Sequence, residues 1–119
     1  MTTLPDDIGT DQDGYPDDAK LRQITEADAV AGGARWMVET FPLLAGTMRP
    51  YAHCEVFDTL DAMDRPAKRI EFSTGGWSGC EALVNAVLGN PWLRVHYYSW
   101  RRGGHYVFEV PVSALKGGA

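Results

Sequence analysis

The residues best placed for chemistry form a glycine-rich run between a strand-like segment and a helix-like one. The run comprises Ser73, Thr74, Gly75, Gly76, Trp77, Ser78 and Gly79. Glycines permit backbone conformations that aim several N–H groups into one concavity, and the N-terminus of a following helix favours an anion. These residues are therefore a candidate site for a phosphate or a carboxylate, to which the hydroxyl groups would add donors.

A structural interpretation explains the same run. A tight turn, in which Ser78 caps the helix and Trp77 packs as an anchor, needs the same glycines and the same serine. The run also lacks the Gly-Lys-Ser/Thr ending of a Walker loop and the glycine spacing of a dinucleotide fingerprint. The tight turn is thus the favoured interpretation, and the anion site is the alternative.

A second candidate lies in the turn of the C-terminal hairpin, at Arg101, Arg102 and His105. Two guanidinium groups and an imidazole suit a phosphate or an acidic protein surface. Arginines at a hairpin tip are more often simply solvated, and the histidine could bond to backbone. If this turn and the glycine-rich run lie at the same end of the sheet, each strengthens the other as part of an anion site.

The third candidate is a mixed face of the same hairpin. If Gly103 and Gly104 form a two-residue turn, facing residue numbers sum to 207. The predicted core face then holds Val95, Tyr97, Ser99, Tyr106, Phe108 and Val110. The opposite face holds Arg94, His96, Tyr98 and Trp100, beside His105, Val107 and Glu109. Aromatic residues on an open sheet suit a protein interface or base stacking, unless the first helix covers them as core.

No catalytic, cofactor or metal site emerges from the pattern. Cys80 near a helix start could have a lowered pKa, but nothing in the spacing pairs it with His96 or His105. An Asp-rich stretch at residues 11–18 fails the EF-hand spacing, because Gly9 and Lys20 fall where the first and last ligands belong. We therefore assign no catalytic residue, no cofactor and no metal ligand, and binding is favoured over catalysis.

The elements that must position these candidates follow from periodicity. An apolar stripe predicts a helix over residues 25–41, capped by Thr25 and ended by Pro42. Strands are expected at residues 53–59 and 68–73, and a second helix follows the glycine-rich run and ends at residues 89–91. Strands at residues 92–100 and 105–111 form the last hairpin. The order α-β-β-α-β-β predicts a single α+β domain with a small antiparallel sheet packed against two helices.

Charge and composition narrow the function classes. The chain has 119 residues and a net charge of −5, and residues 1–18 contain six aspartates and no Lys or Arg. The rest carries 11 basic and 10 acidic residues, which does not favour nucleic-acid binding. We expect residues 1–20 to form a flexible acidic arm before a domain at 21–119. Without a signal-like or membrane-spanning stretch, a cytoplasmic location is expected, with Cys54 and Cys80 as reduced thiols.

Two motifs carry a family resemblance. Residues 70–79 read IEFSTGGWSG, and residues 101–106 read RRGGHY. Together they resemble small proteins of bacteriophages that infect actinobacteria, of the mycobacteriophage type, over roughly residues 53–110. The resemblance implies a phage origin, a shared core and the cytoplasm of the host cell, but no activity. In such relatives the position of Cys80 often holds a polar amide residue, which argues against a general thiol mechanism.

Three classes of function remain. The favoured one is a phage accessory protein that binds a host protein, in which the acidic arm could order on a basic partner. The alternative is a pocket for a nucleotide or another phosphorylated small molecule at the glycine-rich run. A hydrolase or transferase is the third and lacks an activated group. No membrane partner is expected, and an open edge strand of the last hairpin would allow a homodimer.

Overall fold

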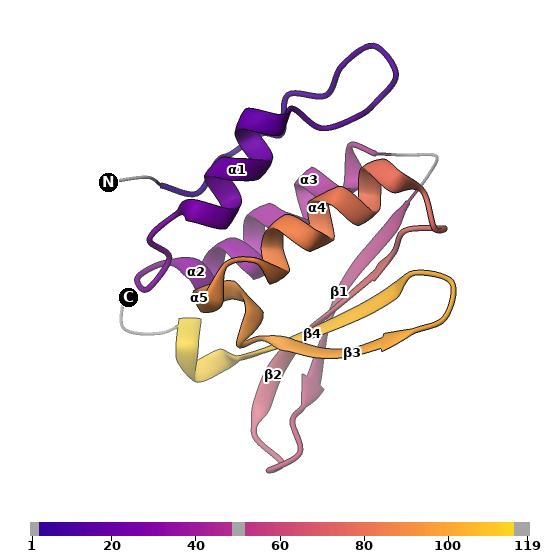
Figure 1. The fold of residues 1–119 in the computed structure, drawn as a ribbon. Helices are drawn as coiled ribbons and strands as arrows, with labels where there is room; N and C mark the ends of the chain where they lie inside the picture. Colours follow the sequence, from indigo (N-terminus) through magenta and orange to yellow (C-terminus); the bar gives the residue numbers. More distant parts are fainter. Residues whose placement is uncertain (1–2, 49–51, 116–119) are drawn as a thin grey trace.

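The computed structural model describes residues 3–48 and 52–115 of the chain. In chain order the elements are α1 (Asp18–Glu26), α2 (Gly33–Arg35), a π-helical turn (Trp36–Thr40), α3 (Phe41–Gly46), β1 (His53–Leu60), β2 (Pro66–Ser73), α4 (Ser78–Leu88), α5 (Pro91–Arg94), β3 (Tyr97–Arg101), β4 (His105–Pro111) and a 3-10 turn (Val112–Leu115). Figure 1 shows these elements as one sheet with its helices.

The four strands form one antiparallel sheet in the order β1-β2-β4-β3. The expected α+β class with an antiparallel sheet is confirmed. Register runs without interruption from β1 to β2 and from β2 to β4, so Ser73 pairs with both His53 and His105. This pairing places the end of β2 beside the start of β4, which decides where the candidate residues meet.

The helices lie on one side of the sheet, and the core fills the space between them (Figure 1). Alternate residues of the two central strands point into it: Ile70 and Phe72 from β2, Phe108 and Val110 from β4. All four side chains are fully buried. The other face of the same strands carries Arg69, Glu71 and Glu109, as the two-residue period of a strand requires. We call this second face the open face of the sheet.

The helix expected over residues 25–41 is not a single helix. α1 starts earlier, at Asp18, where the Asp17 carboxylate accepts the Ala19 N–H (2.7 Å), and it ends at Glu26. A new helix begins after Gly32, whose φ of 86° lies in the left-handed region. The Thr25 hydroxyl caps nothing and instead donates to the Ala86 carbonyl (3.1 Å) of α4. The glycine pair therefore starts a helix, whereas the apolar stripe suggested that one ran through it.

The sequence predicted that Pro42 ends a helix, but the helix that begins after Gly32 continues past it. A proline ring removes the N–H that an α-helix would bond four residues back. The backbone accommodates this loss by widening to a π-helical turn over Trp36–Thr40, in which the Phe41 N–H donates to the Trp36 carbonyl. The helix then continues to Gly46. Trp36, Met37 and Phe41 are buried before the proline, and Leu44 and Ala45 are buried after it.

The N-terminal segment lies against the helices, although the sequence suggested a separate arm. Ile8 is buried in the core, and the Trp36 indole N–H donates to the Pro5 carbonyl (2.9 Å). Tyr15 stacks on Trp77 with 4.7 Å between ring centroids. The packed body therefore includes residues before position 20. These contacts come from scattered residues without periodicity, so no sequence pattern indicated them.

The last hairpin has a three-residue turn at 102–104, because Arg101 pairs directly with His105. Facing numbers therefore sum to 206 near the turn, where we expected 207. A slip of one residue moves side chains to the other face. Trp100 accordingly pairs with Tyr106 on the helix side, and Ser99 pairs with Val107 on the open face. A bulge between Tyr97 and Ser99 returns Tyr97 to the expected core face, but its partner is Phe108, whereas the predicted register paired it with Val110.

The strand expected over residues 92–100 begins only at Tyr97, because α5 takes its first part. Asn90 is fully buried and starts α5: its side-chain oxygen accepts the Trp92 N–H (2.9 Å). Its side-chain N–H groups donate to the Ile24 and Ala27 carbonyls at 2.8 and 3.0 Å, which fastens the end of α1. The Asn-Pro pair is a helix-start signal that we read only as a helix stop.

Replacing Asn90 by alanine should lower the free energy of unfolding by about 2 kcal/mol, because two buried carbonyls and one N–H lose their partner. Urea denaturation of the wild type and N90A measures this change. Asn85→Ala on α4, where the side chain is exposed, is the control and should shift the midpoint little. An equal effect of the two substitutions would contradict the role assigned to Asn90.

No helix within residues 3–48 and 52–115 is both long and apolar enough to cross a bilayer.

Candidate functional site

The glycine-rich run and the hairpin turn meet at one end of the sheet. Ser73 pairs with His105 across β2 and β4, and the Thr74 N–H donates to the Gly104 carbonyl (2.9 Å). Gly75, Gly76 and Gly104 all have positive φ, between 65° and 81°. The geometric condition that linked the two anion-site candidates is therefore met. What the junction can bind depends on the groups already inside it.

A carboxylate of the chain itself occupies the inside of this junction. The fully buried Thr74 hydroxyl donates to Glu81 of α4, and it accepts the Gly76 N–H (3.1 Å). The other Glu81 oxygen accepts the Tyr106 hydroxyl (2.6 Å). Burial and the Glu81 carboxylate raise the pKa of Tyr106 to about 12. Because a negative group already lies between the loop and the first turn of α4, a second anion would be repelled there.

The Trp77 side of the run matches the tight-turn interpretation in part. Trp77 packs on Tyr15, and a Cβ on Gly79 would come within 2.3 Å of the indole ring. Gly79 is therefore needed for close packing. Ser78 does not cap α4 as expected, since its hydroxyl donates to the Tyr15 hydroxyl (3.2 Å) and Trp77 occupies the N-cap position.

A polar row crosses the open face next to the junction. The Ser73 hydroxyl lies 2.6 Å from His105 Nδ1, and His105 Nε2 lies 3.4 Å from a Glu71 oxygen. Arg69 donates to Glu71 at 2.7 Å and to Glu109 at 2.9 Å. Hydrogen bonding to Arg69 holds the pKa of Glu71 below its usual range, so Glu71 is ionised at neutral pH.

This row has the order of a nucleophile, a base and an orienting carboxylate. With the hydrogen on Nε2, facing Glu71, His105 Nδ1 would accept the Ser73 proton, which makes the hydroxyl oxygen a better nucleophile. The three side chains lie on the face of the sheet, however, and line neither of the concavities described below. The row therefore lies outside the surface on which the function proposed below depends.

The hairpin arginines and the two cysteines complete the residues considered in the sequence analysis. Arg101 is the last residue of β3 beside His105, and Arg102 lies in the turn, with both side chains exposed. Cys80 is buried, and burial raises its pKa to about 11, which is the opposite of the lowering that a helix start suggested. Cys54 and Cys80 are both free thiols.

The four residues of the predicted mixed face do not share one face. Arg94 ends α5, and His96 precedes β3. Tyr98 lies on the open face with its ring 5.4 Å from the Arg69 guanidinium, whereas Trp100 lies on the helix side opposite Tyr106. The bulge in β3 and the one-residue slip separate them. Of the four, only His96 and Tyr98 line a common concavity.

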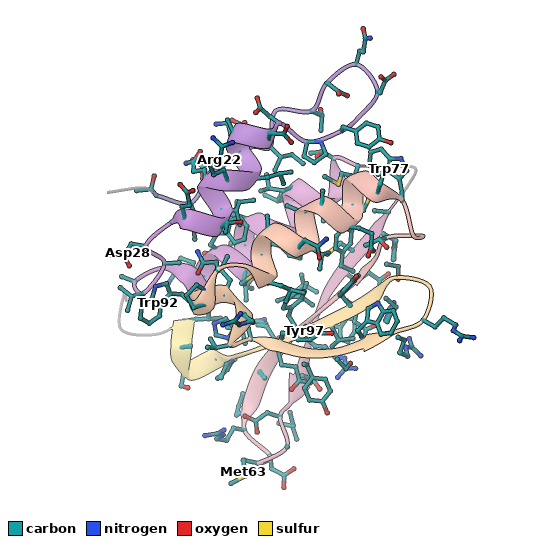
Figure 2. All side chains as sticks on the ribbon, in the orientation of Figure 1. Arg22, Asp28, Met63, Trp77, Trp92 and Tyr97 are labelled. Atoms are coloured by element: carbon teal, nitrogen blue, oxygen red, sulfur yellow. The ribbon has the colours of Figure 1, made fainter. Side chains whose placement is uncertain are left out.

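An apolar surface around His96 replaces the expected one. Two concavities of about 370 and 350 Å³ share Val95, His96 and Ala114. Their rims carry large exposed side chains, and Val95 is 72% exposed. We call this region the His96 surface, and its residues are Trp92, Val95, His96, Tyr97, Tyr98 and Ala114. Figure 2 shows Trp92 at α5 and Tyr97 at the start of β3, so two elements contribute to it.

Electrostatics keep this surface largely uncharged at its centre. Burial lowers the pKa of His96, so the imidazole is neutral at neutral pH. The carboxylates at the rim, Asp61 and Glu109, are bonded to Arg65 and Arg69. Such a surface can bind apolar side chains and donate or accept a hydrogen bond through the imidazole.

Metal binding has no support in the part of the chain that the structure describes. Within residues 3–48 and 52–115 there is no group of three or more His, Cys, Asp or Glu side chains placed to hold an ion. Asp11 instead accepts the N–H groups of Asp13 and Tyr15 at 2.8 and 2.9 Å, as in a simple acidic turn.

Comparison of the chain with known proteins found no match among protein families, curated proteins or solved structures.

Proposed function

We propose that this protein acts by binding another protein through the His96 surface. The observation that carries the proposal is the coincidence of two adjoining concavities with exposed apolar side chains around a neutral imidazole. Both concavities fall in the size range of about 300–1,000 Å³ that is typical of binding sites. Large exposed apolar side chains gathered at one place are typical of interaction surfaces, whereas single ones are common everywhere.

The surface also suggests the chemistry of the partner. Trp92, Tyr97 and Tyr98 are exposed, and Trp and Tyr are among the side chains most often found at interface hot spots. A partner with one or two protruding apolar side chains would fill the adjoining concavities. The resemblance to small phage proteins makes a protein of the actinobacterial host the expected partner, in the cytoplasm of the host cell.

The contacts at the glycine-rich run favour this function over the pocket for a phosphorylated small molecule. Glu81 lies where the phosphate would bind, and the Thr74 hydroxyl and the Gly76 N–H are bonded to each other. A nucleotide would have to displace a buried hydrogen-bond network, which costs about 1–3 kcal/mol for each group left without a partner.

Replacing Val95 by glutamate should weaken binding of the partner at least about tenfold, because a charge would be buried against apolar side chains. Leu43→Glu is the matched control, since Leu43 is 70% exposed on α3, comparable to Val95, and lines neither concavity. The tagged wild type and both variants are exposed to host lysate, and retained proteins are quantified by mass spectrometry. The affinity of the protein lost only by V95E is then measured by calorimetry.

The proposal requires a protein that the wild type and L43E retain and that V95E loses. If V95E retains every protein that the wild type retains, with unchanged affinity, the His96 surface is not the binding site and the proposal fails. Circular dichroism of V95E verifies that the fold is intact, as expected for a change at an exposed position.

A further inference from the structure

The strand β1 forms an open edge that differs from the edge at β3. Within the described residues β1 is hydrogen-bonded only to β2, and all eight of its residues pair in unbroken register. β3 at the other edge has five residues and a bulge. Among the features that usually protect an edge, β1 has no bulge, proline or lysine, and its charged groups are the carboxylates of Glu55 and Asp58. A long regular edge can accept another strand.

Apolar side chains along this edge are exposed on both faces. Phe57 is 39% exposed on the open face, and Leu60 is 59% exposed on the helix side. In Figure 1 the hairpin of β1 and β2 extends past the helical layer. Edge and side chains would both be covered if a second strand added to the sheet here.

We infer that a second copy of this chain pairs with β1 in antiparallel orientation about Phe57, so that two sheets join into one of eight strands. A twofold axis at Phe57 places the two Phe57 rings opposite each other on the open face. It also places Cys54 opposite Leu60, Glu55 opposite Thr59 and Val56 opposite Asp58. The two aromatic rings then face each other and Cys54 faces the apolar Leu60, and cross-strand pairs of these kinds stabilise antiparallel sheets.

Charge selects this region of the strand as the centre. An axis at Glu55 or at Asp58 would bring two identical carboxylates face to face, which is destabilising. An axis at Val56 avoids that repulsion but puts Glu55 opposite Phe57 and Cys54 opposite Asp58. Within one chain Asp58 is paired with Lys68, and Glu55 is bonded to His53 at 2.8 Å. Lys68 therefore offsets the charge of one of the two carboxylates on this strand.

The first test is the mass of the protein in solution as a function of its concentration, measured by sedimentation. The wild type should approach twice the mass of one chain as concentration rises. Phe57→Lys should remain monomeric, since it places two ammonium groups opposite each other at the axis. Leu43→Lys, at an exposed position of α3, should associate like the wild type. A wild type that is monomeric at every concentration would overturn the inference.

A second variant tests the register and does not depend on a charge. Cysteines at Phe57 would face each other within the Cα distance of about 4.4–6.8 Å that a disulfide needs. F57C should therefore form a covalent dimer under mild oxidation. T59C is the control, because its two copies would be about 14 Å apart, four residues at about 3.4 Å each. The native thiol of Cys54 has a pKa raised by burial to about 12 and stays protonated.

Crosslinking at position 57 that clearly exceeds crosslinking at position 59 is the expected result. Equal crosslinking at the two positions would mean that two copies meet by random collision and not in a fixed register, and it would overturn the inference. V56C completes the series, and preferential crosslinking at position 56 would contradict the axis at Phe57. None of these variants alters a residue of the His96 surface, so binding to the partner protein is measured separately.

Discussion

Replacing Gly104 by alanine is expected to lower the free energy of unfolding by about 3 kcal/mol or more. The new Cβ would lie 2.0 Å from the Thr74 hydroxyl oxygen and 3.1 Å from a Glu81 oxygen. Gly104 also has a φ of 81°, which costs an alanine about 1–2 kcal/mol. Thr74 is fully buried and would have to move, and each buried polar group that loses its partner costs about 1–3 kcal/mol.

Gly103 provides the matched control for this substitution. Its φ is 94°, but a Cβ there would meet no atom within 4 Å. Gly103→Ala should therefore show the backbone strain alone, about 1–2 kcal/mol. Urea denaturation of G103A and G104A measures the difference, which isolates the contribution of the Thr74 and Glu81 network. Equal losses in the two variants would contradict the close packing of this junction.

Truncating Phe41 to alanine is expected to cost about 3–5 kcal/mol, as for other fully buried aromatic side chains. Phe41 is wholly inaccessible, and its ring contacts Phe72 and Phe108 with centroids 5.6 and 5.8 Å apart. It thus joins α3 to both central strands of the sheet. No other group can fill the volume of a lost ring without moving the helix or the sheet.

Leu43→Ala is the comparison, since this residue is on the same short helix and largely exposed. Its loss should change the free energy of unfolding by less than about 0.5 kcal/mol. Thermal and urea denaturation of both variants measure the two changes in the free energy of unfolding. A loss below about 1 kcal/mol for F41A would show that the helix does not pack on the sheet as described.

The strands were the most predictable part of the fold. Expected strands at residues 53–59, 68–73 and 105–111 correspond to His53–Leu60, Pro66–Ser73 and His105–Pro111. Ile70 and Phe72 alternate with Arg69, Glu71 and Ser73 in β2, and the helices lie on one face of the sheet. A two-residue period with one apolar face is a strong signal because it follows directly from strand geometry.

The helices were less predictable because their ends depend on contacts distant in sequence. Thr25 has the residue type of a cap, yet its hydroxyl bonds to the Ala86 carbonyl, 61 residues away. Pro42 normally ends a helix, but burial of Trp36 within the π-helical turn and of Phe41 directly after it keeps the helix continuous. Local propensity is a weak guide where packing of this kind decides the backbone.

For the candidate site, the sequence indicated some of the segments involved but not the contacts between them. The sequence left open whether the glycine-rich run and the hairpin turn lie at the same end of the sheet, and in the structure Ser73 lies beside His105. It did not indicate that Glu81 would turn back to Thr74. The His96 surface was missed because α5 was read as part of a strand, although Asn90 followed by Pro91 is a helix-start signal. A surface that combines a short helix, a bulged strand and the chain after β4 has no signature in local sequence.

Site-specific photocrosslinking tests the proposed function most directly. The photoreactive residue p-benzoylphenylalanine replaces Val95 on the His96 surface or, as the control, Leu43 on α3. The proteins are irradiated in living actinobacterial cells, the proposed host, and the crosslinked products are identified by mass spectrometry. We predict one discrete crosslinked host protein at position 95 and none enriched at position 43. The same spectrum of weak products at both positions would contradict binding through the His96 surface.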